Sequence, residues 1–245
     1  MASAFFAAWH ADVCEEITIV MSEDFALMPD ATGSKAATGD GRGDASDTAK
    51  KRQILDGARR VFFEHGFEAA SMNDITRAAG VSKGTIYAYF PSKEALFEAL
   101  VSFEREEQVE RLLVFDMARR DLDQVLQDFG VRLVTSMTAP QSVARLRMVV
   151  GVAPRFPEIG RKFFEAGALI SRRRLGDFLK AKAEEGLLTL DDPYLAARQF
   201  LDLVVADIVR RIIFGLEIDL SPDAISQNAA EATAMFLKAY RGQGA

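Results

Sequence analysis

The chain has 245 residues, of which 49% are hydrophobic, and it carries 30 Lys and Arg residues against 36 Asp and Glu residues. This apolar fraction excludes a wholly disordered chain, and a single cysteine with two histidines excludes a disulfide framework and argues against a metal centre. The net charge of −6 argues, taken alone, against a nucleic-acid partner. No run approaches about 20 uncharged apolar residues, and the first 20 residues lack Lys and Arg, so we expect a cytoplasmic protein without a membrane span or secretory signal.

Residues 1–47 differ in composition from the rest of the chain. They contain nine acidic and two basic residues, and the run 29–47 has no large apolar side chain. Such a segment buries too little apolar surface to offset the conformational entropy that it would lose on folding, so we predict a flexible acidic extension. The alternative is that translation starts at Met21 or Met28. Without this segment the chain is close to neutral. The net negative charge of the whole chain therefore no longer argues against DNA binding.

From Thr48 onward the apolar residues recur at helical spacing, which predicts an all-α protein. A first helix from about residue 48 ends near Gly66, where glycine suits a helix end. Three later helices have serine at the position that caps a helix start: Ser71, Ser82 and Ser92. Further breaks are expected at 139–140, 154–157, 191–193 and 219–222. We therefore predict a helix-turn-helix domain over 48–94 and a larger helical domain over 95–245.

The third predicted helix has two different faces. Ile86 and Phe90 fall on one side and should face the small core. The opposite face carries only small residues between two tyrosines: Gly84, Thr85 and Ala88, flanked by Tyr87 and Tyr89. Such a ridge fits the major groove of DNA, with the tyrosines reaching phosphates. The alternative is a short surface helix whose aromatic residues merely cover the core.

Charge in this region supports a contact with phosphate. Residues 48–94 hold eight basic and five acidic residues. Lys83 and Lys93 stand at predicted helix starts, where the helix dipole disfavours a cation, and Gly84 weakens the first turn. A phosphate bound at each of these helix starts would make the position of the lysine favourable, because the two opposite charges attract. The cluster 50–52 either holds a flanking phosphate or is ordinary solvated charge.

The stretch 48–100 resembles the DNA-binding domain of the TetR family of bacterial transcription regulators. Its most specific segment is Val81-Ser-Lys-Gly-Thr-Ile-Tyr87, followed by Phe90 and Ser92-Lys93. The resemblance implies that Lys83, Thr85, Tyr87 and Tyr89 contact DNA, with Lys93 on a phosphate. The full predicted DNA-binding set is Lys50, Ser71, Asn73, Arg77, Ser82, Lys83, Gly84, Thr85, Tyr87, Ala88, Tyr89 and Lys93.

Residues 147–158 and the following phenylalanines resemble the AefR-like C-terminal group of that family, which implies an effector site and a dimer. The candidate effector pocket consists of apolar residues that alternatively form ordinary core: Phe129, Leu133, Met137, Met148, Val152 and Phe164. The apolar stripe on the helix after residue 193 predicts a four-helix dimer interface. Its candidate residues are Leu201, Val205, Ile208 and Ile212.

These features predict a ligand-responsive regulator, most simply a repressor. It would bind a palindromic double-stranded DNA operator as a homodimer and be released by a small apolar effector. We expect no catalytic residues, cofactor, metal or membrane partner. One alternative is an all-helical enzyme or carrier that uses a C-terminal cavity, although no nucleophile elbow, Cys–His pair or phosphate loop is present. Another is an interaction module with a degenerate helix-turn-helix.

Overall fold

The computed structural model describes residues 41–119 and 121–242, with side chains from residue 47 onward. Within these residues every regular element is helical, apart from one isolated bridge between Leu188 and Arg241. The all-α prediction is therefore confirmed. The predicted flexibility of residues 1–40 lies outside the described residues.

The amino-terminal half of the fold consists of four helices: α2 (Gly41–Ala69), α3 (Met72–Ala79), α4 (Lys83–Tyr89) and α5 (Lys93–Leu112). The three predicted serine caps are confirmed, because the hydroxyls of Ser71, Ser82 and Ser92 accept the backbone N–H three residues on. At Gly66 the backbone leaves the helical region with φ 73°, and one further turn follows to Ala69. The predicted break at this glycine is confirmed.

Helix α2 starts earlier than the sequence predicts. It begins at Gly41, inside the run 29–47 that we expected to be flexible, so that expectation is wrong for residues 41–47. Extending a helix that already exists fixes one residue per hydrogen bond, whereas starting one is costly. The buried residues from Ile54 onward anchor α2, and the poor helix formers before them continue it.

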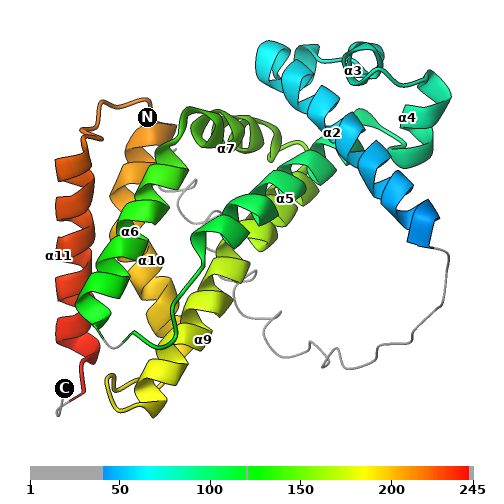
Figure 1. Ribbon diagram of the computed structural model, residues 1–245. Helices are drawn as coiled ribbons and strands as arrows, with labels where there is room; N and C mark the ends of the chain where they lie inside the picture. Colours follow the sequence, from blue (N-terminus) through cyan, green and yellow to red (C-terminus); the bar gives the residue numbers. More distant parts are fainter. Residues whose placement is uncertain (1–40, 120, 243–245) are drawn as a thin grey trace. The chain divides into compact units, whose positions relative to one another are not determined.

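The carboxyl-terminal half contains the remaining helices: α6 (Leu122–Thr138), α7 (Pro140–Val152), α8 (Pro157–Phe164), α9 (Ile170–Glu184), α10 (Pro193–Ile213) and α11 (Pro222–Tyr240). A π-helical turn, η1 (Glu165–Leu169), joins α8 to α9. Four of these helices begin with proline in the first turn, as the predicted breaks require. In Figure 1, α11 lies along α6 and α10.

Two hydrophobic clusters hold the described helices together, and α5 belongs to both. Leu96, Phe97 and Leu100 near its start join the cluster of α2 to α4, which also includes Val149 of α7. Val109 near its end joins the cluster formed with α6, α9, α10 and α11. The predicted boundary at residue 94 therefore does not separate the two cores, because a single helix runs through both.

The predicted dimer residues lie mostly inside this second cluster. Ile208 and Ile212 are only 7% and 6% exposed and pack within their own chain, so they are corrected to core residues. Leu201 and Val205 pack against the same cluster but stay half-buried. The stripe on α10 is wide because α9 of the same chain, together with α6 and α11, covers much of it.

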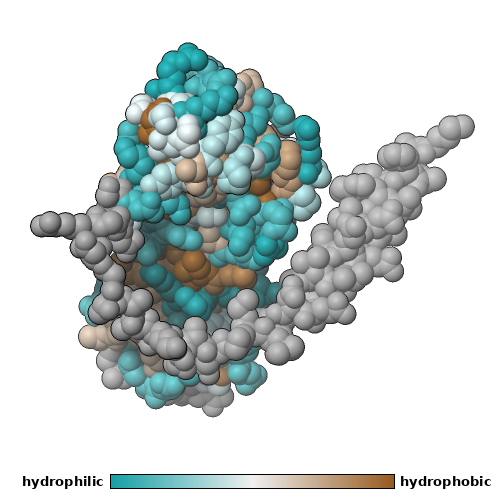
Figure 2. All heavy atoms as spheres, turned by 90° about the vertical axis from the view of Figure 1, so that its right-hand side faces the viewer, coloured by the Kyte–Doolittle hydropathy of each residue, from teal (hydrophilic) through white to brown (hydrophobic). Residues whose placement is uncertain are grey.

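One face of the molecule is mainly polar where its residues are described. On the face shown in Figure 2, hydrophilic residues cover most of the described surface, and hydrophobic residues gather in a band around its middle. No helix in the described ranges is both long enough and apolar enough to cross a membrane.

Candidate DNA-binding surface

Helix α4 presents the two faces that its sequence predicts. Ile86 is fully buried and Phe90, directly after the helix, is 5% exposed. Lys83, Gly84 and Ala88 are exposed, and Tyr87 is 43% exposed. The outward face is therefore a low ridge of small side chains beside a lysine and a tyrosine, a shape that a major groove accepts.

The turn before α4 has the geometry of a helix-turn-helix. Gly80 ends α3 with φ 62° and ψ 39°, the left-handed conformation that favours glycine. Ser82 then caps α4, and its hydroxyl lies 2.7 Å from that of Thr85. Thr85 is half-buried and its hydroxyl already has a partner, so of the predicted groove residues it is less accessible than Gly84 or Ala88.

Side chains of α2 fix the end of α3, and through it the turn into α4. Gln53 Nε2 donates to the carbonyl of Ala79 at 2.7 Å, and Arg60 donates to the carbonyl of Ala78. These bonds satisfy carbonyls that a helix end leaves unpaired. Gly57 of α2 lies directly against Ala79, since a Cβ at residue 57 would be 2.6 Å from the Ala79 Cα. Sequence reasoning missed these three contacts, which fix the end of α3 just before the turn into α4.

Lys93 has an internal role that the sequence did not reveal. Its Nζ donates to three backbone carbonyls at the end of α2, those of Phe67 at 2.8 Å, Glu68 at 3.2 Å and Ala70 at 3.1 Å. It also lies 4.5 Å from the ring centroid of Phe67, a cation–π distance. An ammonium group has three protons, and all are directed at carbonyls here. These contacts explain a cation at a helix start without a phosphate, and the predicted phosphate contact of Lys93 stays a prediction.

We expect Lys93→Met to lower the free energy of unfolding by about 1.5 kcal/mol, because it removes charge-assisted hydrogen bonds to half-buried carbonyls. Thermal unfolding measures this loss. If Lys93 acts only within the protein, the salt dependence of DNA binding keeps its slope in this variant. A flatter slope with unchanged stability would show instead that Lys93 binds a phosphate.

Tyr89 is joined to the start of α2. Its hydroxyl donates to Oδ1 of Asp47 at 2.5 Å, and this bond together with burial raises the pKa of Tyr89. Lys50, one helical turn after Asp47, donates to Gln53 at 2.9 Å. The hydrogen bond between Tyr89 and Asp47 joins the end of α4 to the first part of α2, where Lys50 also lies. It also places an acidic residue, Asp47, beside the predicted DNA contacts, which sequence reasoning missed.

The predicted residues of α3 are divided between the cap and the surface. Ser71 is the cap, and its hydroxyl donates to Asp74, which lowers the pKa of that carboxyl together with the nearby Arg77. Arg77 contacts Asp74 at 3.1 Å and is exposed. Asn73 is exposed as well. Asn73 and Arg77 are therefore open to solvent and stay predicted DNA contacts, whereas Ser71 caps the helix.

The six predicted effector residues do not line one pocket. Phe129 and Leu133 belong to the cluster of α6 and α9 to α11, and Met137 packs against it. Val152 belongs to the cluster around α2 to α5, and Met148 packs against that one. Phe164 is 59% exposed. The prediction of a shared apolar pocket is corrected, because the alternative of ordinary core holds for most of these residues.

A pocket of a different character lies between α2, α5, α6 and α7. Its volume is about 960 Å³. The residues that line it are mostly charged or polar: Arg59, Arg60, Phe63, Glu104, Glu107, Gln108, Arg111, Leu112, Val131, Arg132, Thr135, Ser136, Ala139, Gln141, Ser142 and Arg145. None of the six predicted effector residues is among them.

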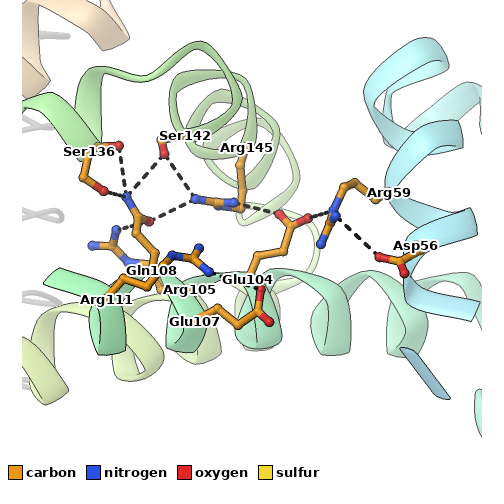
Figure 3. A network of polar contacts seen from close by, with 10 residues as sticks. All are labelled: Asp56, Arg59, Glu104, Arg105, Glu107, Gln108, Arg111, Ser136, Ser142 and Arg145. Atoms are coloured by element: carbon orange, nitrogen blue, oxygen red, sulfur yellow. Dashed lines mark hydrogen bonds and ion pairs between the residues drawn. The ribbon is translucent and has the colours of Figure 1, made fainter. Parts of the chain in front are cut away.

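A polar network runs through this pocket, and Glu104 of α5 is at its centre (Figure 3). The Glu104 carboxylate accepts from Arg145 Nη1 of α7 at 2.7 Å and from Nε of Arg59 of α2. Gln108 continues the network to α6 by donating to Ser136 Oγ at 2.7 Å. Glu104 and Arg145 are 7% exposed, so a buried ion pair joins α5 to α7, and the half-exposed Arg59 connects this pair to α2.

The geometry defines a class of protein. A capped, short, exposed helix follows a glycine turn and two supporting helices, and a larger helical region follows in the same chain. This is the arrangement of a helix-turn-helix DNA-binding regulator.

Comparison with known proteins identifies the family. Residues 54–100 match the model of the bacterial regulatory proteins of the tetR family, and residues 124–242 match that of the AefR-like transcriptional repressor C-terminal domain. The HTH-type transcriptional repressor Rv1474c of Mycobacterium tuberculosis is 31% identical over 170 residues, which cover 68% of this chain and 84% of that protein. The chain therefore belongs to the TetR family.

Solved structures agree with this assignment. The flavonoid-responsive regulator FrrA is 38% identical with a TM-score of 0.70, over 80% of this chain and 100% of that one. A TetR-family regulator from Mesorhizobium loti has a TM-score of 0.73 at 24% identity, over 79% of this chain and 98% of that one, which supports the fold. The protein is thus a DNA-binding regulator.

Proposed function

We propose that this protein is a transcriptional repressor that binds a palindromic operator as a homodimer and releases it when a small molecule binds. The outward face of α4 is the observation that carries this proposal, because Lys83, Gly84 and Tyr87 are exposed while Ile86 anchors the helix from behind. The repressors among its relatives support the direction of regulation. The proposal includes a cytoplasmic location, where operator DNA is found, and regulation by binding alone.

The proposed dimer surface uses the exposed parts of α10 and α11. Leu201 and Val205 stay half-buried in the single chain. Near them in the sequence, on the two helices or the connection between them, are large apolar residues that remain exposed: Leu203, Ile213, Phe214, Leu216, Leu220 and Met235. Apolar residues of this number and size favour a partner over solvent. A two-fold dimer would place two α4 helices roughly 34–36 Å apart, one turn of DNA.

A small molecule that controls DNA binding is the third part of the proposal. FrrA, which matches 80% of this chain, is described as flavonoid-responsive. In this protein the pocket between α2, α5, α6 and α7 offers the space for an effector. An effector that binds one conformation more tightly shifts the population toward that conformation and so changes the affinity for DNA, and DNA changes the affinity for the effector by the same factor.

DNA binding is tested with the DNA upstream of the protein's own gene, by a shift assay or fluorescence anisotropy at several salt concentrations. We expect Lys83→Ala to weaken binding about fivefold to tenfold and to flatten the slope of log affinity against log salt by about 0.9, the value for one lost phosphate contact. Tyr87→Phe removes only a hydroxyl and should weaken binding if that group reaches the DNA backbone.

The matched control is Lys180→Ala, which removes an exposed lysine of α9 away from the proposed surface. Its affinity and slope should equal those of the unchanged protein. If Lys83→Ala and Tyr87→Phe behave like this control, the DNA-contact assignment on α4 is wrong. If no fragment is bound more tightly than unrelated DNA, the repressor proposal itself fails.

A further inference from the structure

The pocket between α2, α5, α6 and α7 has an excess of positive charge. Five arginines line it, Arg59, Arg60, Arg111, Arg132 and Arg145, against the two acidic residues Glu104 and Glu107. An unbalanced set of guanidinium groups around one cavity is the usual chemistry for recognising a carboxylate or phosphate.

The two carboxylates of the pocket are each shared between arginines. Glu104 binds both Arg59 and Arg145. Glu107 lies 3.3 Å from Arg52 and 3.8 Å from Arg111, so its contact with Arg111 is loose. Arg132 forms no ion pair with any acid in the described ranges and is exposed. Arg111 and Arg132 therefore have guanidinium donors to offer to another anion.

The buried side of the network also lacks negative charge. Arg145 is only 7% exposed, and its Nε is buried without a hydrogen-bond partner. The neighbouring Arg105 has a buried, unpartnered Nε as well, and burial together with the charge of Arg145 lowers the pKa of Arg105 to about 10. A buried guanidinium, Arg145, and a half-buried one, Arg105, thus lie near one buried carboxylate, Glu104. Such uncompensated charge is costly unless an anion neutralises it.

We propose that this pocket binds an organic carboxylate with an apolar body, and that this anion is the effector of the repressor. The inference rests on the function proposed above and names the chemistry of its ligand. Phe63, Leu112 and Val131 give the pocket apolar wall for the body of the molecule. The volume of about 960 Å³ matches ligand pockets, which span roughly 300–1,000 Å³.

The position of the arginines connects this pocket to the recognition helix. Arg59 and Arg60 lie on α2, while Arg145 lies on α7. Arg60 also donates to the carbonyl of Ala78 at the end of α3, immediately before the turn into α4. An anion that draws Arg60 into the pocket releases this hold on α3. An anion that competes for Arg59 weakens its pairing with Glu104. Both changes favour a different placement of α4.

The experiment measures ligand binding directly, without DNA, by calorimetry on the full chain. The probes are four carboxylates, octanoate, decanoate, 2-naphthoate and indole-3-acetate, each paired with its neutral amide of the same size. We expect at least one carboxylate to bind at least tenfold more tightly than its amide. Arg132→Gln should reduce that affinity about tenfold, and Arg111→Gln should reduce it as well. Both residues are exposed enough for folding to survive.

The control variant is Arg173→Gln, which removes an exposed arginine of α9 that does not line the pocket. It should leave carboxylate binding unchanged. The same carboxylate should then weaken DNA binding of the unchanged protein and have less effect on Arg132→Gln. The inference is overturned if no carboxylate binds better than its amide, or if Arg132→Gln and Arg173→Gln bind it equally. Because DNA binding without ligand is measured separately, failure of the pocket and failure of the repressor proposal are distinguishable.

Discussion

Glu104→Met should lower the free energy of unfolding by about 3–5 kcal/mol, the cost of leaving a buried charge without its partner. Glu104 is 7% exposed and accepts from Arg145 at 2.7 Å. Methionine fills a similar volume but offers Arg145 no negative charge. Arg59, which is 41% exposed, can turn toward solvent and Asp56 instead. Chemical denaturation followed by circular dichroism measures the loss.

Two comparisons separate this effect from a simple loss of packing. The double change Glu104→Met with Arg145→Met removes both charges and should cost less than Glu104→Met alone. The exposed pair Asp207–Arg211, at 2.7 Å with side chains 64% and 48% exposed, is the surface control. Asp207→Asn should change stability by no more than about 0.5 kcal/mol. Equal costs for the buried and the exposed changes would contradict the assigned role of Glu104.

Features set by neighbouring residues could be predicted from the sequence. The serine caps, the helix break at Gly66 and the later breaks at 139–140, 154–157, 191–193 and 219–222 each depend on a few consecutive positions, and each is confirmed. The two faces of α4 follow from its helical period, which separates Ile86 from Tyr87. The shape of the candidate surface was therefore predictable from the sequence.

Features set by distant residues could not be predicted in this way. Glu104 and Arg145 are 41 positions apart, and no local pattern marks them as partners. Ile208 and Ile212 have the spacing of an interface, but only the packed chain shows that their partners are internal. The carbonyl partners of Lys93 lie in α2 and the connection after it, so no pattern around Lys93 marks them. A local sequence pattern can show that a polar or apolar side chain needs a partner, but it does not show which distant residue is that partner.

The second large effect is expected at Gly57, where α2 approaches α3. Gly57→Ala places a Cβ 2.6 Å from both the Cα and the Cβ of Ala79 and 2.7 Å from its nitrogen. Because two of these three atoms are backbone, the two helices must separate. We expect a loss of about 2–3 kcal/mol of stability, the upper part of the usual range for overpacking. This loss occurs although alanine favours helix over glycine by about 1 kcal/mol.

The change should also reduce DNA binding more than stability alone explains. Gln53 holds the Ala79 carbonyl, so moving α3 away from α2 displaces the turn at Gly80 and the start of α4. DNA affinity should fall at least tenfold at temperatures where the variant remains folded.

The matched control is Gly151→Ala on α7, where an added Cβ meets nothing within 4 Å. It should be neutral or stabilise the protein by up to about 1 kcal/mol through helix propensity, with DNA binding unchanged. If Gly57→Ala behaves like Gly151→Ala in both measurements, α2 does not fix the position of the recognition helix through this contact. A stable Gly57→Ala variant that still loses DNA affinity would instead show that the contact sets the geometry of α4 rather than the stability of the fold.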